Sequence, residues 1–253
     1  MTDPDALPAA VPSAALVGLV RDGVLDAELA ALLWLTVEGG IPVVVAGVAG
    51  EDRRAVRDAL LTLAPDTAPV VLLAGTAEDF AWMPQAGELG WQSTGLAEPG
   101  KPGAVMVAEL EPGDAGTWGE AAHLAIRALT AGYSLVATAG GSTLEDVLGR
   151  LSMPPVSAVD DELTRLGVVL LLDDGPRLRI AHYLRPAARD PGGHVQRPSP
   201  AALAAWNGKT DRYDHFAWGV VAELAGRIGQ RPIALEREQA RRSSVVASAA
   251  AGA

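Results

Sequence analysis

The sequence predicts an α/β fold in which helices cover a mostly parallel β-sheet. Short apolar runs typical of buried parallel strands recur along the chain, at 42–46, 69–75, 103–110 and 133–140. Segments with helical spacing follow the first and third of these runs, and strands that alternate with helices favour a parallel sheet. Two further apolar runs flank the turn Asp-Asp-Gly-Pro at 173–176, which predicts an antiparallel hairpin over 168–184 at the edge of the sheet.

The composition limits the classes of function. With 253 residues, the chain allows one large domain, or one domain and an extension. An apolar content of 49% is typical of a globular protein. The net charge of −11 argues against binding to nucleic acid or to an anionic membrane, because both require a basic surface. The absence of cysteine excludes disulfides and thiolate chemistry.

The cellular location also follows from the sequence. No apolar run approaches the ~18 residues of a membrane span, so we expect no membrane insertion. The N-terminus is acidic and lacks the basic region of a signal peptide. These observations predict a cytoplasmic protein.

Each element of the predicted domain, which spans 13–185, has its own signals. Two helical patterns occupy 13–37, with Asp26 as the N-cap of the second. Ser142 and Glu145 predict a capping box at the start of another helix. The remaining predicted elements are helices at 51–63 and 116–131 and an irregular Gly-, Pro- and Trp-rich segment at 76–103.

The amino-acid composition of the chain changes after residue 184. A Pro- and Gly-rich linker is predicted at 186–200, and a helical extension at 201–243. Within this extension the helical segments are 201–206, 216–228 and 236–242. The last ten residues, 244–253, are expected to be disordered.

The first predicted strand runs through a turn of small residues into a helix. A phosphate-binding loop of the form GxxxxGK[ST] would lie at this position, with backbone N–H groups and a lysine around the phosphates. Gly47 and Gly50 are present, but Asp52 replaces the second required glycine. Arg53 replaces the lysine and Arg54 replaces the hydroxyl residue that binds Mg²⁺. The architecture therefore predicts a nucleotide-binding fold, while the residues of the loop argue against ordinary nucleotide binding.

Two interpretations of the loop arginines remain open. Arg53 could substitute for the lysine, because a guanidinium binds phosphate well. Alternatively, Arg53 and Arg54 form ion pairs with Glu51, Asp52 or Asp58 at an exposed helix start. The two acids at 51 and 52 disfavour any anion at the loop, so we favour local ion pairs.

Taken in order, these segments resemble the C-terminal ATPase domain of the type II/IV secretion and pilus-assembly ATPases. The resemblance covers about 15–185, and it depends on the order and spacing of the segments more than on any one motif. The matching segments are 29–47 (the helix and strand before the Walker A loop), 70–79 (the acidic box), 104–110 (the Walker B strand), 121–151 (a helix, a strand, the histidine box and a helix ending in Arg-Leu) and 168–184 (the closing hairpin).

The resemblance implies a RecA-like P-loop fold and assigns positions to several residues. Glu109 falls on the Walker B glutamate, which would polarise the attacking water, and Glu78 and Arg150 match family residues. The chain departs from the family at the Walker A loop, at the first two acids of the acidic box, where it has Ala74 and Gly75, and at the histidine box, where it has a glycine at 140. All three motifs contact the same ligand in the family.

These departures predict a catalytically degenerate member that acts as an assembly or regulatory subunit through protein–protein contacts. Because family members form hexameric rings, the expected partner is an active secretion or pilus ATPase, or further copies of the chain itself. No cofactor and no metal site are expected. The extension offers four aromatic residues as interface anchors: Trp206, Tyr213, Phe216 and Trp218.

Two alternative functions remain open. The first is an active ATP hydrolase in which Arg53 binds the phosphates and Glu109 activates water, with ATP and Mg²⁺ as ligands. The second is a module that binds another small anion at Gly47–Gly50. A weaker possibility for Glu78 and Asp79 is a divalent-cation site completed by Glu109.

Overall fold

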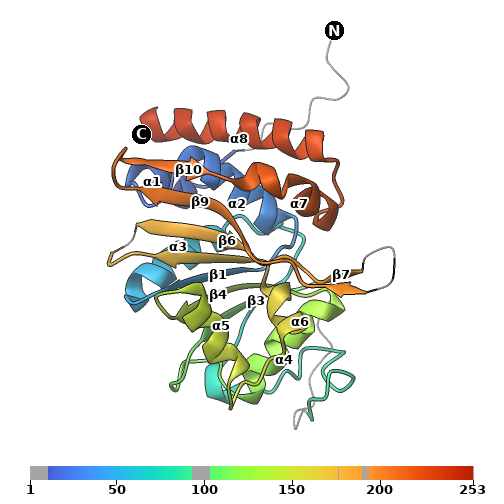
Figure 1. The fold of residues 1–253 in the computed structure, drawn as a ribbon. Coiled ribbons are helices and arrows are strands. Elements are labelled where there is room, and N and C mark those ends of the chain that lie inside the picture. The colour runs from blue at the N-terminus through green and yellow to red at the C-terminus, as the bar shows by residue number, and fades with distance from the viewer. Residues whose placement is uncertain (1–10, 93–102, 176, 190–191, 193, 253) are drawn as a thin grey trace.

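The computed structural model describes residues 11–92, 103–175, 177–189, 192 and 194–252. Its central feature is an eight-stranded sheet with the strand order β10-β9-β6-β5-β1-β4-β3-β2. Helices cover both faces of this sheet (Figure 1). The predicted α/β fold, a mostly parallel sheet covered by helices with a helix at the C-terminus, is confirmed. The predicted hairpin also forms, but it does not lie at the edge of the sheet, because two further strands continue the sheet beyond it.

Five strands form the parallel part of the sheet. They are β1 (Val43–Gly47), β2 (Val70–Leu72), β3 (Val105–Leu110), β4 (Ser134–Gly140) and β5 (Val168–Leu172). β1 lies in the middle, paired with β4 on one side and β5 on the other. Because all five run the same way, their carboxyl ends lie at one edge of the sheet.

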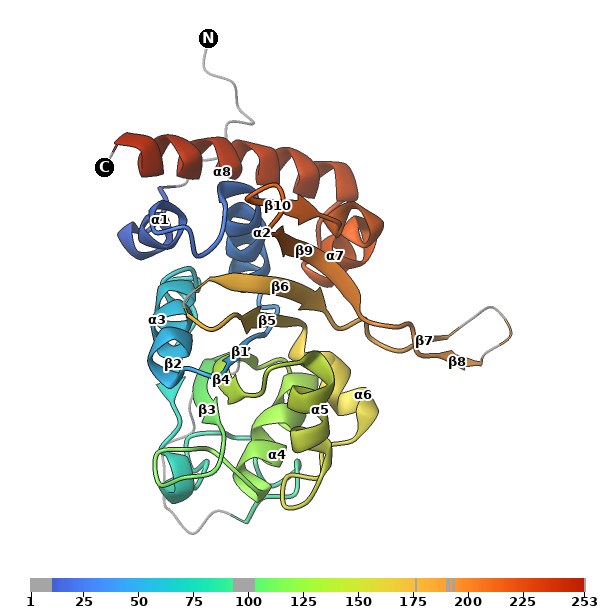
Figure 2. The same cartoon turned by 60° about the vertical axis from the view of Figure 1, so that its left-hand side comes forward.

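Three strands continue the sheet in antiparallel pairs: β6 (Leu178–Tyr183), β9 (Ala201–Asn207) and β10 (Arg212–His215). The β5–β6 pair is the hairpin predicted at 168–184. Between β6 and β9, two short strands, β7 (Ala188–Arg189) and β8 (Val195–Gln196), form an arm that projects from the body of the molecule (Figure 2).

The alternating side chains of the strands build two hydrophobic cores, one on each face. Val43 and Val45 of β1 belong to the first core, while Val44 and Ala46 belong to the second. The first core contains residues of α1 (Ala14–Arg21), α2 (Ala27–Glu38), α3 (Gly50–Leu61), α7 (Val221–Arg227) and α8 (Pro232–Gly252). The second contains residues of α4 (Glu120–Ala128), α5 (Leu144–Ser152) and α6 (Asp160–Leu163). Four short 3-10 turns complete the fold: η1 (Gly75–Ala77), η2 (Leu129–Ala131), η3 (Thr164–Leu166) and η4 (Ala217–Gly219).

The structure corrects the predicted extension in two places. Residues 201–206 form strand β9 and not a helix, although four of the six are alanine, a strong helix former. Pairing with β6 and β10 overrides this local preference. The tail expected to be disordered continues α8 as far as Gly252; residue 253 lies outside the described residues.

Other differences are smaller. Thr143, and not Ser142, caps α5, because its side chain accepts a hydrogen bond from the backbone N–H of Asp146. β2 is an edge strand with exposed side chains at Val70 and Leu72, so it is less buried than its apolar sequence suggested. Part of the predicted irregular segment, 93–102, lies outside the described residues.

Aromatic contacts order the described part of the segment before residue 93. Phe80 contacts Trp82 and Trp91, and Trp82 contacts Tyr133, which directly precedes β4. Over the described residues, none of the helices is both long enough and apolar enough to cross a membrane.

Candidate functional site

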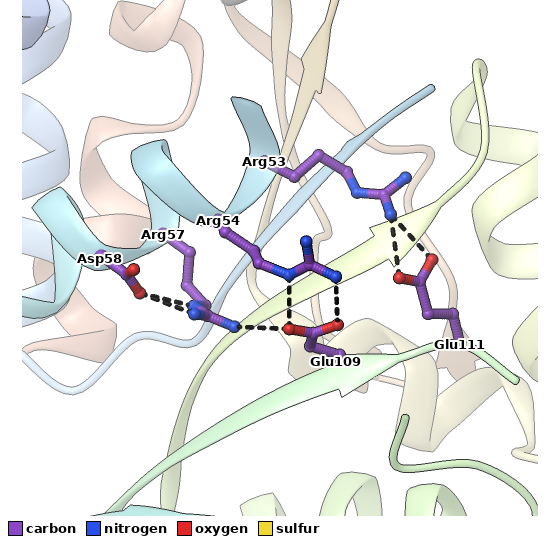
Figure 3. A network of polar contacts seen from close by, with 6 residues as sticks. All are labelled: Arg53, Arg54, Arg57, Asp58, Glu109 and Glu111. Atoms are coloured by element: carbon purple, nitrogen blue, oxygen red, sulfur yellow. Dashed lines mark hydrogen bonds and ion pairs between the residues drawn. The ribbon is translucent and has the colours of Figure 1, made fainter. Parts of the chain in front are cut away.

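The candidate site lies where β1 passes into α3, at the carboxyl edge of the parallel strands. β1 ends at Gly47 and α3 begins at Gly50, so the backbone forms the strand, short turn and helix that the sequence predicted. Glu109 is near the end of β3, and Glu111 follows that strand. Figure 3 shows that the arginines of α3 point across β4 toward these two glutamates.

Arg53 is a buried arginine that bonds to the loop itself. Its residue is 5% exposed, and its Nη1 donates a hydrogen bond to the carbonyl oxygen of Gly47. Its Nη2 lies 2.8 and 3.0 Å from the two carboxylate oxygens of Glu111. The Arg53 side chain is therefore fixed between Gly47, at the end of β1, and Glu111, which follows β3 (Figure 3).

Arg54 forms a second ion pair, and this one is bidentate. Its Nε lies 2.7 Å from Oε1 of Glu109, and its Nη2 lies 3.1 Å from Oε2. Arg57, one turn further along α3, lies 3.6 Å from the same Oε1 and 2.8 Å from Asp58. Both carboxylate oxygens of Glu109 are thus occupied by guanidinium groups, a strong geometry for an ion pair.

These contacts lower the pKa of Glu109. The hydrogen bond from Arg54 is the largest cause, and it outweighs the opposing effect of partial burial. The same hydrogen bond raises the pKa of Arg54. A carboxylate with a lowered pKa is a weak base, so this environment does not favour proton abstraction from water by Glu109.

The predicted partners of the arginines were wrong in one respect. Arg53 and Arg54 pair with Glu111 and Glu109, which are more than 50 positions away, and not with the acids of their own helix. Of the acids expected as local partners, Asp58 does form an ion pair within α3, but its partner is Arg57. Glu111 and Arg57 are therefore the members of this network that the sequence interpretation missed. The sequence held a partial signal, two acids two positions apart at the end of a predicted strand, but it did not show that they face the arginines of α3.

A glycine makes room for a further arginine beside this network. A Cβ added to Gly140, at the end of β4, would lie 2.7 Å from Nη1 of Arg150 and 3.3 Å from Oε2 of Glu111. A side chain at this position would therefore displace the end of the Arg150 side chain. The position where the family would have its histidine is instead filled by Arg150, which lies in the last turn of α5.

Glu78 has a structural role in the part of the chain that the structure describes. Its carboxylate accepts hydrogen bonds from the backbone N–H groups of Ala74 and Phe80 and from the indole of Trp82, at 2.9, 2.8 and 3.2 Å. Across the described residues, no three His, Asp or Glu side chains are grouped so that they could hold a metal ion. Glu78, Asp79 and Glu109 therefore do not form the cation site considered from the sequence.

The residues at the loop do not fit a Mg²⁺–nucleotide. Phosphate binding at this turn needs free backbone N–H groups and an available cation. Here the cation of Arg53 is bound to Glu111, and position 54, where a hydroxyl would bind Mg²⁺, carries a guanidinium bound to Glu109. No catalytic step through a Mg²⁺–nucleotide is therefore assigned to this loop.

Comparison with known proteins gives similarity to solved structures alone. No protein-family model matches the chain, and no curated protein matches it either. A solved structure with a similar fold is the VirB11 ATPase from the Brucella suis type IV secretion system in complex with sulphate. The match has a TM-score of 0.44 and 16% identity over 72% of this chain, which spans 60% of the length of that protein. Similarity at this level does not establish a shared activity.

Proposed function

We propose that this protein is a catalytically inactive relative of the secretion and pilus-assembly ATPases. It acts as an assembly or regulatory subunit through protein–protein contacts. The observation that carries this proposal is the pair of ion pairs, Arg53 with Glu111 and Arg54 with Glu109, in each of which both carboxylate oxygens accept a hydrogen bond. They use the cations that a phosphate would need and the carboxylate that would activate water.

The energetics of the loop support this function. To admit a nucleotide, Arg53 would have to leave Glu111 and the Gly47 carbonyl, and the polar groups left behind are largely buried. Breaking such a pair costs about 3–5 kcal/mol, which a ligand must offset before it gains any affinity. Asp52 and Glu51 also place negative charge in the first turn of α3 and disfavour an anion there.

The direct test is thermal unfolding with and without millimolar Mg²⁺-ATP, with sulfate at matched ionic strength as the control. A ligand present at one hundred times its dissociation constant adds ~2.7 kcal/mol to stability. We expect no rise in melting temperature with the nucleotide beyond that with sulfate. A rise specific to the nucleotide would contradict the proposal.

The second candidate function is an ATP hydrolase with a non-standard loop. The position of Glu109 at the end of a central strand favours it, because α/β sheets bind ligands at this edge. It requires Mg²⁺-dependent nucleotide affinity that Arg53→Ala abolishes and Glu88→Gln, on the far side of the sheet, leaves intact. If equal stabilisation is found with sulfate and ATP, the loop is an anion site without nucleotide preference.

A further inference from the structure

A groove lies between the first turn of α2, the turn η4 and one face of α8. Its volume is about 500 Å³. We call it the Trp218 groove; it is lined by Glu28, His215, Trp218, Val221, Glu236 and Ala240, among others. Apart from Glu28, its lining residues come from the C-terminal part of the chain, and it does not include any residue of the loop after β1.

Trp218 is the exposed aromatic side chain of this groove. It is 79% exposed, whereas Trp206 and Tyr213 are already used within the fold. The guanidinium of Arg177 lies 4.2 Å from the Trp206 ring, and the Tyr213 hydroxyl donates to carbonyl oxygens of the chain. Of the predicted anchors, Trp218 thus offers the most surface to a partner, and an exposed tryptophan beside a concavity is typical of an interface.

The charge of the groove is negative. Glu236 makes no ion pair with any residue that the structure describes, and Glu28 is 53% exposed. Glu28 has one cationic neighbour, Nδ1 of His215 at 3.6 Å, but that ring is bound more closely by Asp26, at 2.8 Å. Among the described residues, the groove therefore has carboxylates that no arginine or lysine side chain pairs with, and they are available for a cation from a partner.

The same chain shows what such a set of residues binds. On the other side of α8, the guanidinium of Arg242 lies 4.5 Å from the Trp34 ring and is bound by Glu38 and Glu238. One tryptophan and two glutamates thus hold one arginine. The Trp218 groove is lined by the same residue types, one tryptophan and two glutamates, and no guanidinium of the described residues lines it.

We propose that the Trp218 groove docks an arginine or lysine side chain presented by an apolar segment of a partner protein. The cation would lie against the indole and between Glu28 and Glu236, and its methylene groups would pack on Val221 and Ala240. This inference rests on the proposed function and adds the chemistry of the partner. The two carboxylates, with the net charge of −11, oppose an anionic membrane at the same surface.

The test uses the tripeptide acetyl-Leu-Arg-Leu-amide and matched peptides with glutamate or norleucine in place of arginine. The full chain, with 5-fluorotryptophan at its six tryptophans, is followed by fluorine NMR, and Trp218→Phe assigns the signal. We expect a saturable shift of the Trp218 signal with the arginine peptide only. Glu236→Gln should weaken binding about fivefold, while Glu88→Gln, which removes an exposed charge elsewhere, should not.

Several outcomes would overturn the docking proposal. They are no shift with the arginine peptide, or the same shift with the glutamate peptide. A Trp218 shift that follows protein concentration alone would identify a second copy as the occupant, and broadening with phosphatidylglycerol vesicles would identify a membrane. Because Trp218 lies apart from the β1–α3 loop, nucleotide binding found by thermal unfolding would contradict the proposed function and leave the peptide result standing.

Discussion

At the scale of single residues, the two ion pairs of the loop differ in their contact with water. The Arg53 side chain is 6% exposed and that of Arg54 is 44% exposed, while their glutamates are similarly covered. An isolated buried charge is costly, but an exposed one is solvated. We therefore expect the two pairs to differ in their effect on stability.

Replacing each glutamate by glutamine separates these effects. We expect Glu111→Gln to lower the free energy of unfolding by about 3 kcal/mol, because it leaves the Arg53 guanidinium buried without a counter-ion. Glu109→Gln should cost no more than about 1 kcal/mol, since Arg54 reaches water. Urea unfolding at neutral pH measures both. Equal losses would show that burial of the arginine does not decide the cost.

The lowered pKa of Glu109 predicts how stability depends on pH. A carboxyl whose pKa is lower in the folded state stabilises the fold above its ordinary pKa of 4.5, and this contribution is lost as the pH falls through the folded-state pKa. We expect the stability advantage of wild type over Glu109→Gln to shrink below about pH 4.5. Urea unfolding of both proteins across that range tests this, and a constant difference would contradict it.

The sequence could predict which residues of α3 carry charge, but not their partners. Arg53 and Arg54 have acids next to them in the chain, and local pairs are the simplest expectation. The fold instead brings Glu109 and Glu111 into reach, because β3 and α3 end and begin at the same edge of the sheet. Contacts between residues more than 50 positions apart depend on the sheet order, which a single sequence does not contain.

At the scale of elements, the strands with strong sequence signals were predicted correctly, and the segments with weak signals were not. The parallel strands and the β5–β6 hairpin carry long apolar runs and a clear turn, and they form where predicted, although the hairpin lies inside the sheet and not at its edge. β9 is rich in alanine, so its helical preference misled the prediction; its strand is set by β6 and β10 on either side. The C-terminal end of α8 is stabilised by packing on α1 and α2, which no local signal shows.

Helix α8 offers a test of this packing. Leu235 is 1% exposed, while Ile233, two positions earlier, is 56% exposed. Leu235→Ala should lower the free energy of unfolding by about 2–4 kcal/mol, because it removes a buried side chain. Ile233→Ala should stay within about 0.5 kcal/mol of wild type. If chemical denaturation gave the two variants equal stability, α8 would not be packed on the body of the protein.

At the scale of the whole molecule, the sheet crosses the predicted boundary at 186–200. β9 and β10 extend the sheet that β1 to β6 begin, and the first hydrophobic core contains Leu16, Leu203 and Val246 together. The two sides of the predicted linker therefore share buried surface. A shared core favours unfolding in one step.

We expect a single cooperative unfolding transition for residues on both sides of that boundary. Tryptophan fluorescence and far-UV circular dichroism, recorded across a urea titration, should give coincident curves. Two separate transitions would support independent units at 13–185 and 201–243. The same titration on Leu203→Ala, a buried β9 residue, should shift the whole curve and not a part of it.

The pairing of charges at the loop also constrains how this sequence can change. Each of the two guanidinium groups has one carboxylate of its own, so a substitution toward a lysine-and-hydroxyl loop leaves an opposite charge without a partner. The first steps of such a change lower stability before any phosphate can bind. A lineage that carries this network therefore has a barrier against acquiring phosphate binding at this loop.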